Sequence, residues 1–294
     1  MFEEKQPGQY HSAIVDVTDK CNLRRRHCFY FREEHDSRDM EEGAFLEGLE
    51  TLRDRHNILS MGWCGGEPTY RRELLEKGTG LFKFNTIYSN GTLPFPRLPN
   101  AIVCVSIDGP PEVHNYIRGA GAFEKSLENV RRAKLPLVIF LTTINRKNAP
   151  HLKEMVSILS RVPNARLGVL FFTPLKTYRP VKGYEHTAEQ AESLALSPEE
   201  RDRAIEDLLE MKKEYEGFIF NPARTLELMM SGSSEKCVAL CNMPDRTLTL
   251  DLRLERKLPC VLGRDVDCGQ CGCVFPFLQQ AKKEGDPESV ALAF

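Results

Sequence analysis

Six apolar runs, separated by amphipathic stretches, fill the first 220 residues and constrain the fold more than any other feature. The runs are rich in Val, Ile, Leu and Phe without strict alternation, which is typical of parallel strands covered on both faces. Stretches between them, such as 41–56 and 122–133, gather their apolar residues on one helical face. The repeated order of strand and helix predicts a parallel α/β fold, and periodicity leaves a partial barrel and an open sheet both possible. The predicted strands are His11–Val17, Ile58–Trp63, Phe84–Tyr88, Ala101–Ile107, Leu135–Thr143 and Ala165–Phe172.

The residue composition of the chain changes twice after the sixth run. Residues 174–196 hold Pro174, Pro180 and Gly183 with few apolar residues, which predicts a long loop that either contacts a substrate or only connects elements. A helix over 198–216 should follow, because Ser197-Pro198-Glu199-Glu200 combines an N-cap serine, a first-turn proline and a capping-box glutamate. Beyond residue 231 cysteines recur at short intervals. We therefore expect two domains, 1–230 and 231–294.

Composition excludes several classes of protein. The 294-residue chain has a formal net charge of −2, so it has no bulk attraction to nucleic acid, and Arg24, Arg25 and Arg26 are too few to form a phosphate track. No apolar stretch is long enough for a transmembrane span, and residues 1–5 contain no signal-peptide core. These features predict a cytoplasmic protein without a transmembrane segment.

The ten cysteines fall into groups that favour metal binding over disulfides in a reducing compartment. Cys21 and Cys28 lie seven positions apart, directly after the first predicted strand. A second group lies within 37 residues near the C-terminus: Cys237, Cys241, Cys260, Cys268, Cys271 and Cys273. Thiolates gathered so closely are typical ligands of iron–sulfur clusters or zinc.

Further motifs follow the cysteine loop in a characteristic order. Gly65-Gly66-Glu67-Pro68 comes after the second strand and Ser89-Asn90-Gly91 after the third, and the fourth is followed by Ser106-x-Asp108-Gly109, His114 and Arg118-Gly119. This order, over roughly residues 10–220, resembles the radical S-adenosylmethionine (SAM) superfamily, in particular its SPASM/twitch-like or adenosylhopane-synthase-like members. The resemblance implies a partial (β/α)6 TIM-like barrel with a small cysteine-rich C-terminal extension.

The resemblance also implies a chemistry and a set of site residues. In that superfamily three cysteines hold a [4Fe-4S] cluster, which cleaves SAM reductively to a 5′-deoxyadenosyl radical, with electrons from a donor such as flavodoxin or ferredoxin. Cys21 and Cys28 match the outer cluster ligands. The positions that match SAM-binding residues are His27 near the adenine, Gly65, Gly66 and Glu67 at the methionine, Asn90 after the third strand, Ser106 and Asp108 near the ribose, and Arg118 near the carboxylate. The substrate could be a peptide, a lipid or a small metabolite.

The chain departs from the superfamily at the middle cluster ligand, where Arg25 stands in place of a cysteine. A guanidinium stays protonated and has no lone pair, so it cannot replace a thiolate. Arg25 could be an inactivating change that a single base produces. Alternatively, Cys64 could complete the site, or the chain could be a pseudoenzyme that keeps only the SAM pocket.

The C-terminal cysteines predict a second metal site, held by Cys260, Cys268, Cys271 and Cys273 with Cys237 and Cys241 as alternates. The resemblance favours an auxiliary [4Fe-4S] cluster, and structural zinc is the alternative because it accepts four thiolates equally well. Two functions therefore stay open at this point. The first is a radical SAM enzyme, impaired by Arg25. The second is a non-catalytic scaffold with zinc or a single auxiliary cluster in its tail.

Overall fold

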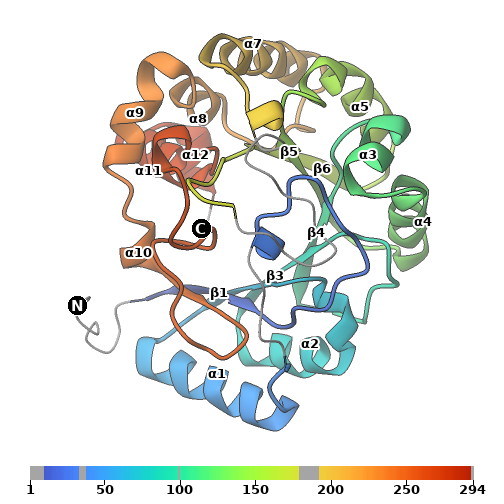
Figure 1. Cartoon of the computed structure of the whole chain (residues 1–294), viewed down its shortest axis with the longest axis vertical. Coiled ribbons are helices and arrows are strands. Elements are labelled where there is room, and N and C mark those ends of the chain that lie inside the picture. The colour runs from blue at the N-terminus through green and yellow to red at the C-terminus, as the bar shows by residue number, and fades with distance from the viewer. Residues whose placement is uncertain (1–9, 33–37, 99, 179–191, 293–294) are drawn as a thin grey trace.

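Seven parallel strands form the centre of the computed structural model, which describes residues 10–32, 38–98, 100–178 and 192–292. Their order across the sheet is β6-β5-β4-β3-β2-β1-β7, and the sheet is open (Figure 1). All six predicted strands are present, and the predicted partial barrel is confirmed. The strands are β1 (Ser12–Asp16), β2 (Ser60–Cys64), β3 (Phe84–Ser89), β4 (Ala101–Ser106), β5 (Val138–Ile144), β6 (Ala165–Phe171) and β7 (Thr247–Leu250).

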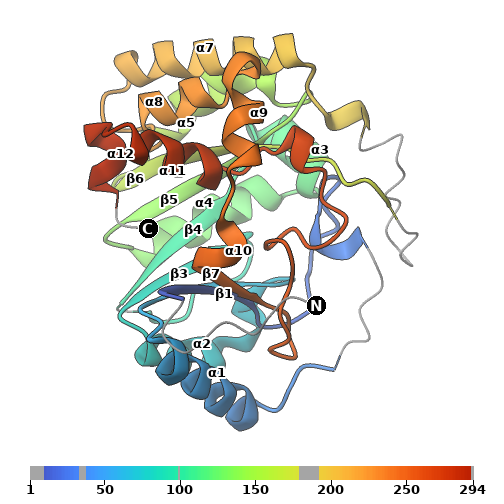
Figure 2. The same cartoon turned by 90° about the vertical axis from the view of Figure 1, so that its left-hand side faces the viewer.

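Helices cover the outer face of this curved sheet (Figure 2). α1 (Glu42–His56), α4 (Ala122–Ala133) and α7 (Pro198–Glu214) occupy the predicted stretches, and α7 begins with the predicted capping box between Ser197 and Glu200. The remaining helices are α2 (Arg72–Gly78), α3 (Pro111–Arg118), α5 (Leu152–Leu159), α8 (Ala223–Leu228), α9 (Ser231–Ala239), α10 (Met243–Arg246), α11 (Phe275–Lys283) and α12 (Pro287–Ala291). None of the described helices is both long and apolar enough to cross a membrane.

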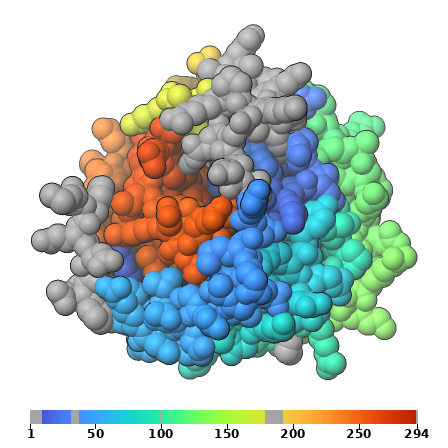
Figure 3. Space-filling model, turned by 60° about the horizontal axis from the view of Figure 1, so that its bottom comes forward, coloured from blue at the N-terminus to red at the C-terminus, as the bar shows by residue number. Residues whose placement is uncertain are grey.

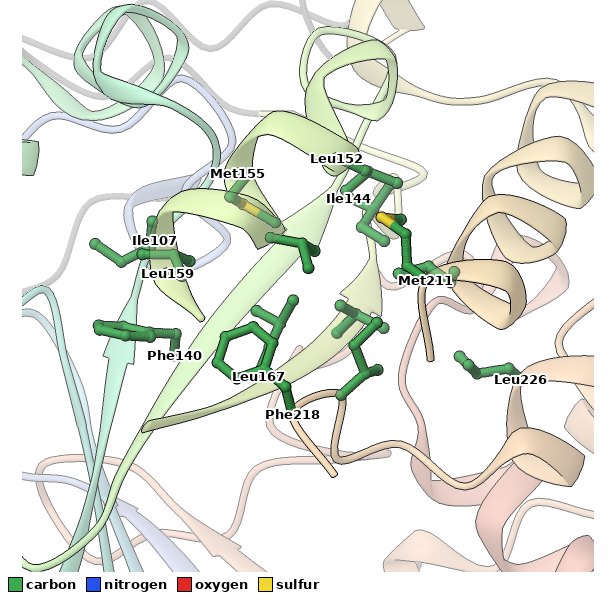
Figure 4. Close-up of a cluster of buried hydrophobic side chains, with 14 of the residues drawn as sticks. Ile107, Phe140, Ile144, Leu152, Met155, Leu159, Leu167, Met211, Phe218 and Leu226 are labelled. Carbon is green, nitrogen blue, oxygen red and sulfur yellow. The ribbon is translucent and has the colours of Figure 1, made fainter. Parts of the chain in front are cut away.

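The apolar core is divided between the two halves of the sheet. One cluster fills the space between β4–β6 and the helices α4, α5, α7, α8 and α11, and Figure 4 shows its centre around Phe140 and Leu167. The other lies under β1–β3 and contains the fully buried Trp63, whose indole Nε1 donates to Asn85 Oδ1 at 3.0 Å. Burial of apolar side chains on this scale fixes the positions of the strand ends, and functional sites of parallel α/β folds are built at the carboxyl ends of their strands.

The strand β7 comes from the cysteine-rich segment and was not anticipated from the sequence. It pairs in parallel with β1, in the register Ser12 with Thr247 to Val15 with Leu250. Next to it, Lys257 Nζ contacts Asp16 Oδ2 at 2.6 Å, and both side chains are largely buried. The segment after residue 231 is thus joined to the sheet, although the two-domain division itself stays a prediction.

Part of the predicted loop 174–196 lies outside the described residues, since these omit 179–191. Its first residues contact the cysteine-rich segment: Leu175 bridges to Val266, and Lys176 N donates to Asp265 O at 2.8 Å. This end of the loop therefore lies against the tail.

Candidate functional site

The loop after β1 carries Cys21, Arg25 and Cys28 to the carboxyl ends of the strands. The same end of the sheet receives the loop of the cysteine-rich tail, as both views show (Figures 1 and 2). Figure 3 shows the tail, in orange, lying against N-terminal segments in blue on this face. Parallel sheets carry their sites at the carboxyl ends of the strands, so this is the place where a functional site is expected.

The Arg25 side chain lies against Cys28, and its charge also acts on Cys21. Its Nη2 donates a hydrogen bond to Cys28 Sγ at 3.3 Å, and the backbone N of Cys28 donates to Arg25 O at 3.2 Å. The Cys28 side chain is buried, and Cys21 is half-buried. Burial raises the pKa of Cys21, although the positive charge of Arg25 acts in the opposite direction.

These residues do not fit a cluster held by three thiolates. The loop offers two sulfur atoms, and a permanently charged guanidinium lies at one of them. Cys64 ends β2, in register with Asp16, and burial followed by the Asp16 carboxylate raises the pKa of its thiol. Within the described residues, no three cysteine, histidine or carboxylate side chains converge closely enough to hold one metal ion. The role of Cys64 as a replacement ligand stays a prediction.

Gly65 and Gly66 join the end of β2 to the start of the cysteine loop. Gly66 N donates to Thr18 O at 2.7 Å, and Glu67 N donates to Lys20 O at 2.8 Å. A Cβ atom on Gly66 would lie 2.4 Å from the carbonyl oxygen of Lys20, so only glycine permits this approach. The glycines thus set the position of the loop that carries Cys21.

The Glu67 carboxylate is buried and saturated by neighbouring groups. It accepts hydrogen bonds from Thr69 Oγ1 at 2.6 Å, Ser89 Oγ at 2.8 Å and Asn90 N at 2.7 Å. Asn90 in turn reaches the cysteine loop, where its Nδ2 donates to Asn22 Oδ1 at 3.0 Å. The side chain of Glu67 therefore organises the ends of β2 and β3, and a contact with a ligand would be left to the backbone of this turn.

Asp108 is the centre of a buried ionic network behind the cysteine loop. Its Oδ2 contacts Arg118 Nε at 2.5 Å and His27 Nε2 at 3.0 Å, and its Oδ1 accepts from Thr143 N at 3.0 Å. Burial would raise the pKa of Asp108, but the charge of Arg118 and the hydrogen bonds from His27 and Arg118 outweigh it and hold the pKa well below its usual range. Both carboxylate oxygens are thus engaged with protein groups. Ser106 lies at the end of β4, two residues earlier, and the ribose contacts of both residues stay predictions.

Three polar atoms of this network have no hydrogen-bond partner among the described residues. They are His27 Nδ1, His114 Nε2 and Arg118 Nη1, and all three are buried. Buried polar groups normally find partners, and those that do not commonly mark a bound group or a functional role. The Nη1 atom of Arg118 could donate to a ligand carboxylate, and its contact with the carboxylate of SAM stays a prediction.

Both buried histidines predict a loss of stability in mild acid. Burial, followed by the charge of Arg118, lowers the pKa of His114 to about 3, and burial also lowers the pKa of His27. Below about pH 6.5 the unfolded chain therefore binds protons that the folded chain does not, so unfolding becomes easier as the pH falls. We expect the free energy of unfolding to fall by up to ~1.4 kcal/mol per pH unit for each histidine. Denaturant titrations at several pH values between neutral and 5 give the free energy of unfolding as a function of pH. This free energy should fall less steeply with pH in His114→Asn than in the unchanged chain, whereas the exposed His11→Gln should leave the pH dependence as it is. An equal pH dependence in His114→Asn and the unchanged chain would contradict the assignment.

The tail cysteines divide into a clustered set and an outlier. Burial raises the pKa values of Cys260, Cys271 and Cys273, and nearby thiols of the same set raise each of them further, Cys241 among them. Cys268 acts on Cys241, Cys260 and Cys271 in the same way. Cys237 instead lies in the apolar core on α9, with Glu284 and Arg224 as its charged neighbours. Of the two alternates, the structure therefore places Cys241 with the predicted set and Cys237 apart from it.

The tail loop is fixed against the end of β6. Phe171 N donates to Gly272 O at 2.9 Å, and Gly272 N donates to Thr173 Oγ1 at 2.8 Å. A Cβ on Gly272 would lie 1.9 Å from the Phe171 carbonyl oxygen, which explains the glycine between Cys271 and Cys273. Tyr88 of β3 is half-buried, and Cys273 is one of the groups that raise the pKa of its phenol, after burial, Cys104 and Cys64.

Comparison with known proteins agrees with this geometry. The sequence matches the radical SAM superfamily over residues 15–159, which include both loop cysteines, the Gly-Gly-Glu turn and the Asp108 network. The chain carries a radical SAM domain. Sequence relatives include the sporulation killing factor maturation protein SkfB of Bacillus subtilis (24% identity over 159 residues, 49% of this chain and 38% of the relative). Another is a cysteine-type anaerobic sulfatase-maturating enzyme of Clostridium novyi (27% over 177 residues, 50% and 47%).

Solved structures share the fold of the radical SAM domain and its tail. The structure of anSMEcpe with bound AdoMet and the Cp18Cys peptide has a TM-score of 0.62 at 19% identity and covers 96% of this chain and 84% of its own. Streptococcus suis SuiB bound to precursor peptide SuiA has a TM-score of 0.63 at 14% identity and covers 97% and 66%. This chain spans less than half the length of the two curated relatives named above. At these identities the structural likeness shows the fold.

Proposed function

We propose that this chain is a SAM-binding protein of the radical SAM superfamily whose reductive cleavage of SAM is impaired by Arg25. The observation that carries this proposal is the 3.3 Å contact between Arg25 Nη2 and Cys28 Sγ. It puts a fixed positive charge where the superfamily has a third thiolate. The polar groups around the proposed SAM pocket are retained, including Asn90 and the unpartnered Nη1 atom of Arg118.

We propose a peptide as the substrate class. Two structures that share this fold were solved with a peptide bound, anSMEcpe with Cp18Cys and SuiB with SuiA. Lipid and small-metabolite substrates have no comparable support. The electron donor and a cytoplasmic location stay predictions.

The tail is proposed to hold an auxiliary metal site. The thiols of Cys241, Cys260, Cys268, Cys271 and Cys273 are near enough for members of the set to raise the pKa values of Cys241, Cys260, Cys271 and Cys273. No three of them converge on one point in the described residues, so binding a metal would have to draw them together. Such a soft donor set suits an iron–sulfur cluster or zinc, either of which would deprotonate the thiols on binding. When bound there, the metal would fasten the tail loop over the end of β6.

A second candidate function is a scaffold that binds SAM without cleaving it. The local fit of Arg25 favours it, because Arg25 donates to Cys28 through its side chain and accepts from the same residue through its backbone. A residue whose side chain and backbone both form hydrogen bonds within the loop is part of the loop's structure.

One experiment tests the proposed function. After anaerobic reconstitution with iron and sulfide, equilibrium dialysis should detect weak binding of labelled SAM, while chromatography detects no 5′-deoxyadenosine above the reductant blank. Elemental analysis of the same sample should find metal bound by the tail, and should find as much in a Cys21→Ala, Cys28→Ala double variant. Rapid SAM cleavage by the chain as it stands would refute the impairment, and a folded double variant without metal would refute the tail site.

A further inference from the structure

A basic pocket opens at the surface beside the cysteine loop. It has a volume of about 280 Å³ and is lined by Arg26, Tyr116, Arg146, Lys147, Ser193 and Leu194. Arg26 follows Arg25 directly in the loop after β1, Tyr116 lies on α3, and Arg146 and Lys147 follow β5. The basic pocket is therefore built from the same strand ends as the proposed SAM pocket, and it opens outward.

The positive groups of the basic pocket surround one aromatic ring. The Arg26 guanidinium carbon lies 4.4 Å from the centroid of the Tyr116 ring, and Lys147 Nζ lies 4.8 Å from it. Tyr116 is 50% exposed, so its ring is available to a ligand. Two cations around one ring repel each other, and a negative group placed between them would relieve that repulsion.

The charges of Arg26 and Lys147 are not neutralised within the described part of the chain. Arg146 pairs with Glu200 at 3.0 Å, but neither Arg26 nor Lys147 forms an ion pair with a described residue. Within the described residues, the Arg26 side chain donates one hydrogen bond, from Nε to the carbonyl oxygen of Tyr116 at 3.1 Å. Arg26 and Lys147 thus leave a charge of about +2 at the pocket, in a protein whose overall formal charge is −2.

The backbone that presents these cations is fixed before any ligand arrives. Arg26 N donates to Ile117 O at 3.0 Å, which ties the cysteine loop to α3. Lys147 N donates to Asn145 Oδ1 at 3.0 Å, and the neighbouring Asn148 donates to Asp108 O at 3.0 Å. The basic pocket is therefore anchored to the buried ionic network, and a preorganised site loses less entropy when it binds a ligand.

We propose that the basic pocket binds the carboxylate side chains of an acidic peptide segment, and so holds the substrate beside the SAM pocket. This deepens the proposed function and rests on its peptide substrate. A peptide fits better than a nucleic acid, because two uncompensated cations in one small pocket do not form the extended track that a phosphate backbone requires. The half-exposed Tyr116 ring adds a surface on which the aliphatic part of a glutamate can pack.

The test measures binding on the full chain without iron, so it is independent of SAM cleavage. A fluorescent peptide of alternating glutamate and glycine should bind with a strong dependence on salt, and the matched glutamine and glycine peptide should not. Arg26→Gln and Lys147→Gln should each weaken binding about 2- to 5-fold, and together about 10-fold. Lys125→Gln, which removes an exposed cation on α4, should have no effect.

A charge reversal keeps the proposal falsifiable if the neutral variants lose structure. The Arg26→Glu, Lys147→Glu variant should prefer a peptide of alternating lysine and glycine, a gain that an unfolded protein cannot produce. Equal binding of the glutamate and glutamine peptides would overturn the proposal. So would an equal loss in Lys125→Gln, or tighter binding of a single-stranded RNA that the same variants weaken.

Discussion

Arg25→Cys should raise the iron content of the reconstituted protein by one [4Fe-4S] cluster, about four iron ions per chain. The change supplies the missing thiolate and removes the guanidinium that contacts Cys28 Sγ at 3.3 Å. Production of 5′-deoxyadenosine from SAM should then appear or rise. Iron and sulfide analysis, together with chromatography of the products under reducing conditions, gives both readouts.

Arg24→Cys is the matched control for this variant. Arg24 is the exposed neighbour of Arg25 in the same loop, so the control adds a thiol one position away from the superfamily's spacing. It should gain neither the cluster nor the cleavage. If the unchanged chain cleaves SAM as fast as Arg25→Cys, the argument from the missing ligand is wrong, and Cys64→Ala becomes the next variant to assay. If Arg25→Cys gains iron without cleavage, the scaffold function is favoured.

Asp108→Ala should lower the free energy of unfolding by about 3–5 kcal/mol, because it leaves the buried charge of Arg118 without its partner. Arg118 is only 2% exposed, so water cannot replace the carboxylate. Denaturant unfolding monitored by circular dichroism measures the loss. Asp54→Ala breaks an exposed ion pair with Arg53 and should leave the free energy of unfolding almost unchanged.

A double variant separates the effect of an unpaired buried charge from the effect of losing the side-chain contacts of the network. Asp108→Ala, Arg118→Met removes both charges and should recover part of the stability, since an unpaired buried charge costs more than the loss of the pair. A loss below about 1 kcal/mol in Asp108→Ala would show that the network does not hold the strand ends together. Any effect of Asp108→Ala on SAM affinity has to be judged against this loss of stability.

The sequence predicted the elements whose patterns are local. The six strands are continuous apolar runs, and the start of α7 follows from the capping pattern of Ser197 and Glu200, which does not depend on distant residues. β7 was missed because Thr247–Leu250 is short and becomes a strand only through its pairing with β1. Its alternation of threonine and leucine covers only four residues, which is too short to distinguish a strand from a loop.

The sequence predicted which residues gather at this end of the sheet, but not how they contact one another. The order of motifs brought Cys21, Cys28, the Gly-Gly-Glu turn and Asp108 to one end of the sheet. The pairing of Asp108 with Arg118 and His27 depends on how α3 and the cysteine loop pack, which no spacing in the sequence reveals. Similarly, Cys237 and Cys241 are four positions apart at the end of α9, and only the packing of that helix turns Cys237 into the core.

The pairing of β7 with β1 has a consequence for the order in which the chain folds. Ser12 and Thr247 are hydrogen-bonded partners 235 residues apart, so β1 acquires its second neighbour only after nearly the whole chain has been synthesised. Contacts over such separations form late, because closing a long loop costs entropy before the contact repays it. During that interval Asp16, at the end of β1, also lacks its partner Lys257 from the tail. The strand that leads into the cysteine loop is thus completed late, when β7 joins the sheet.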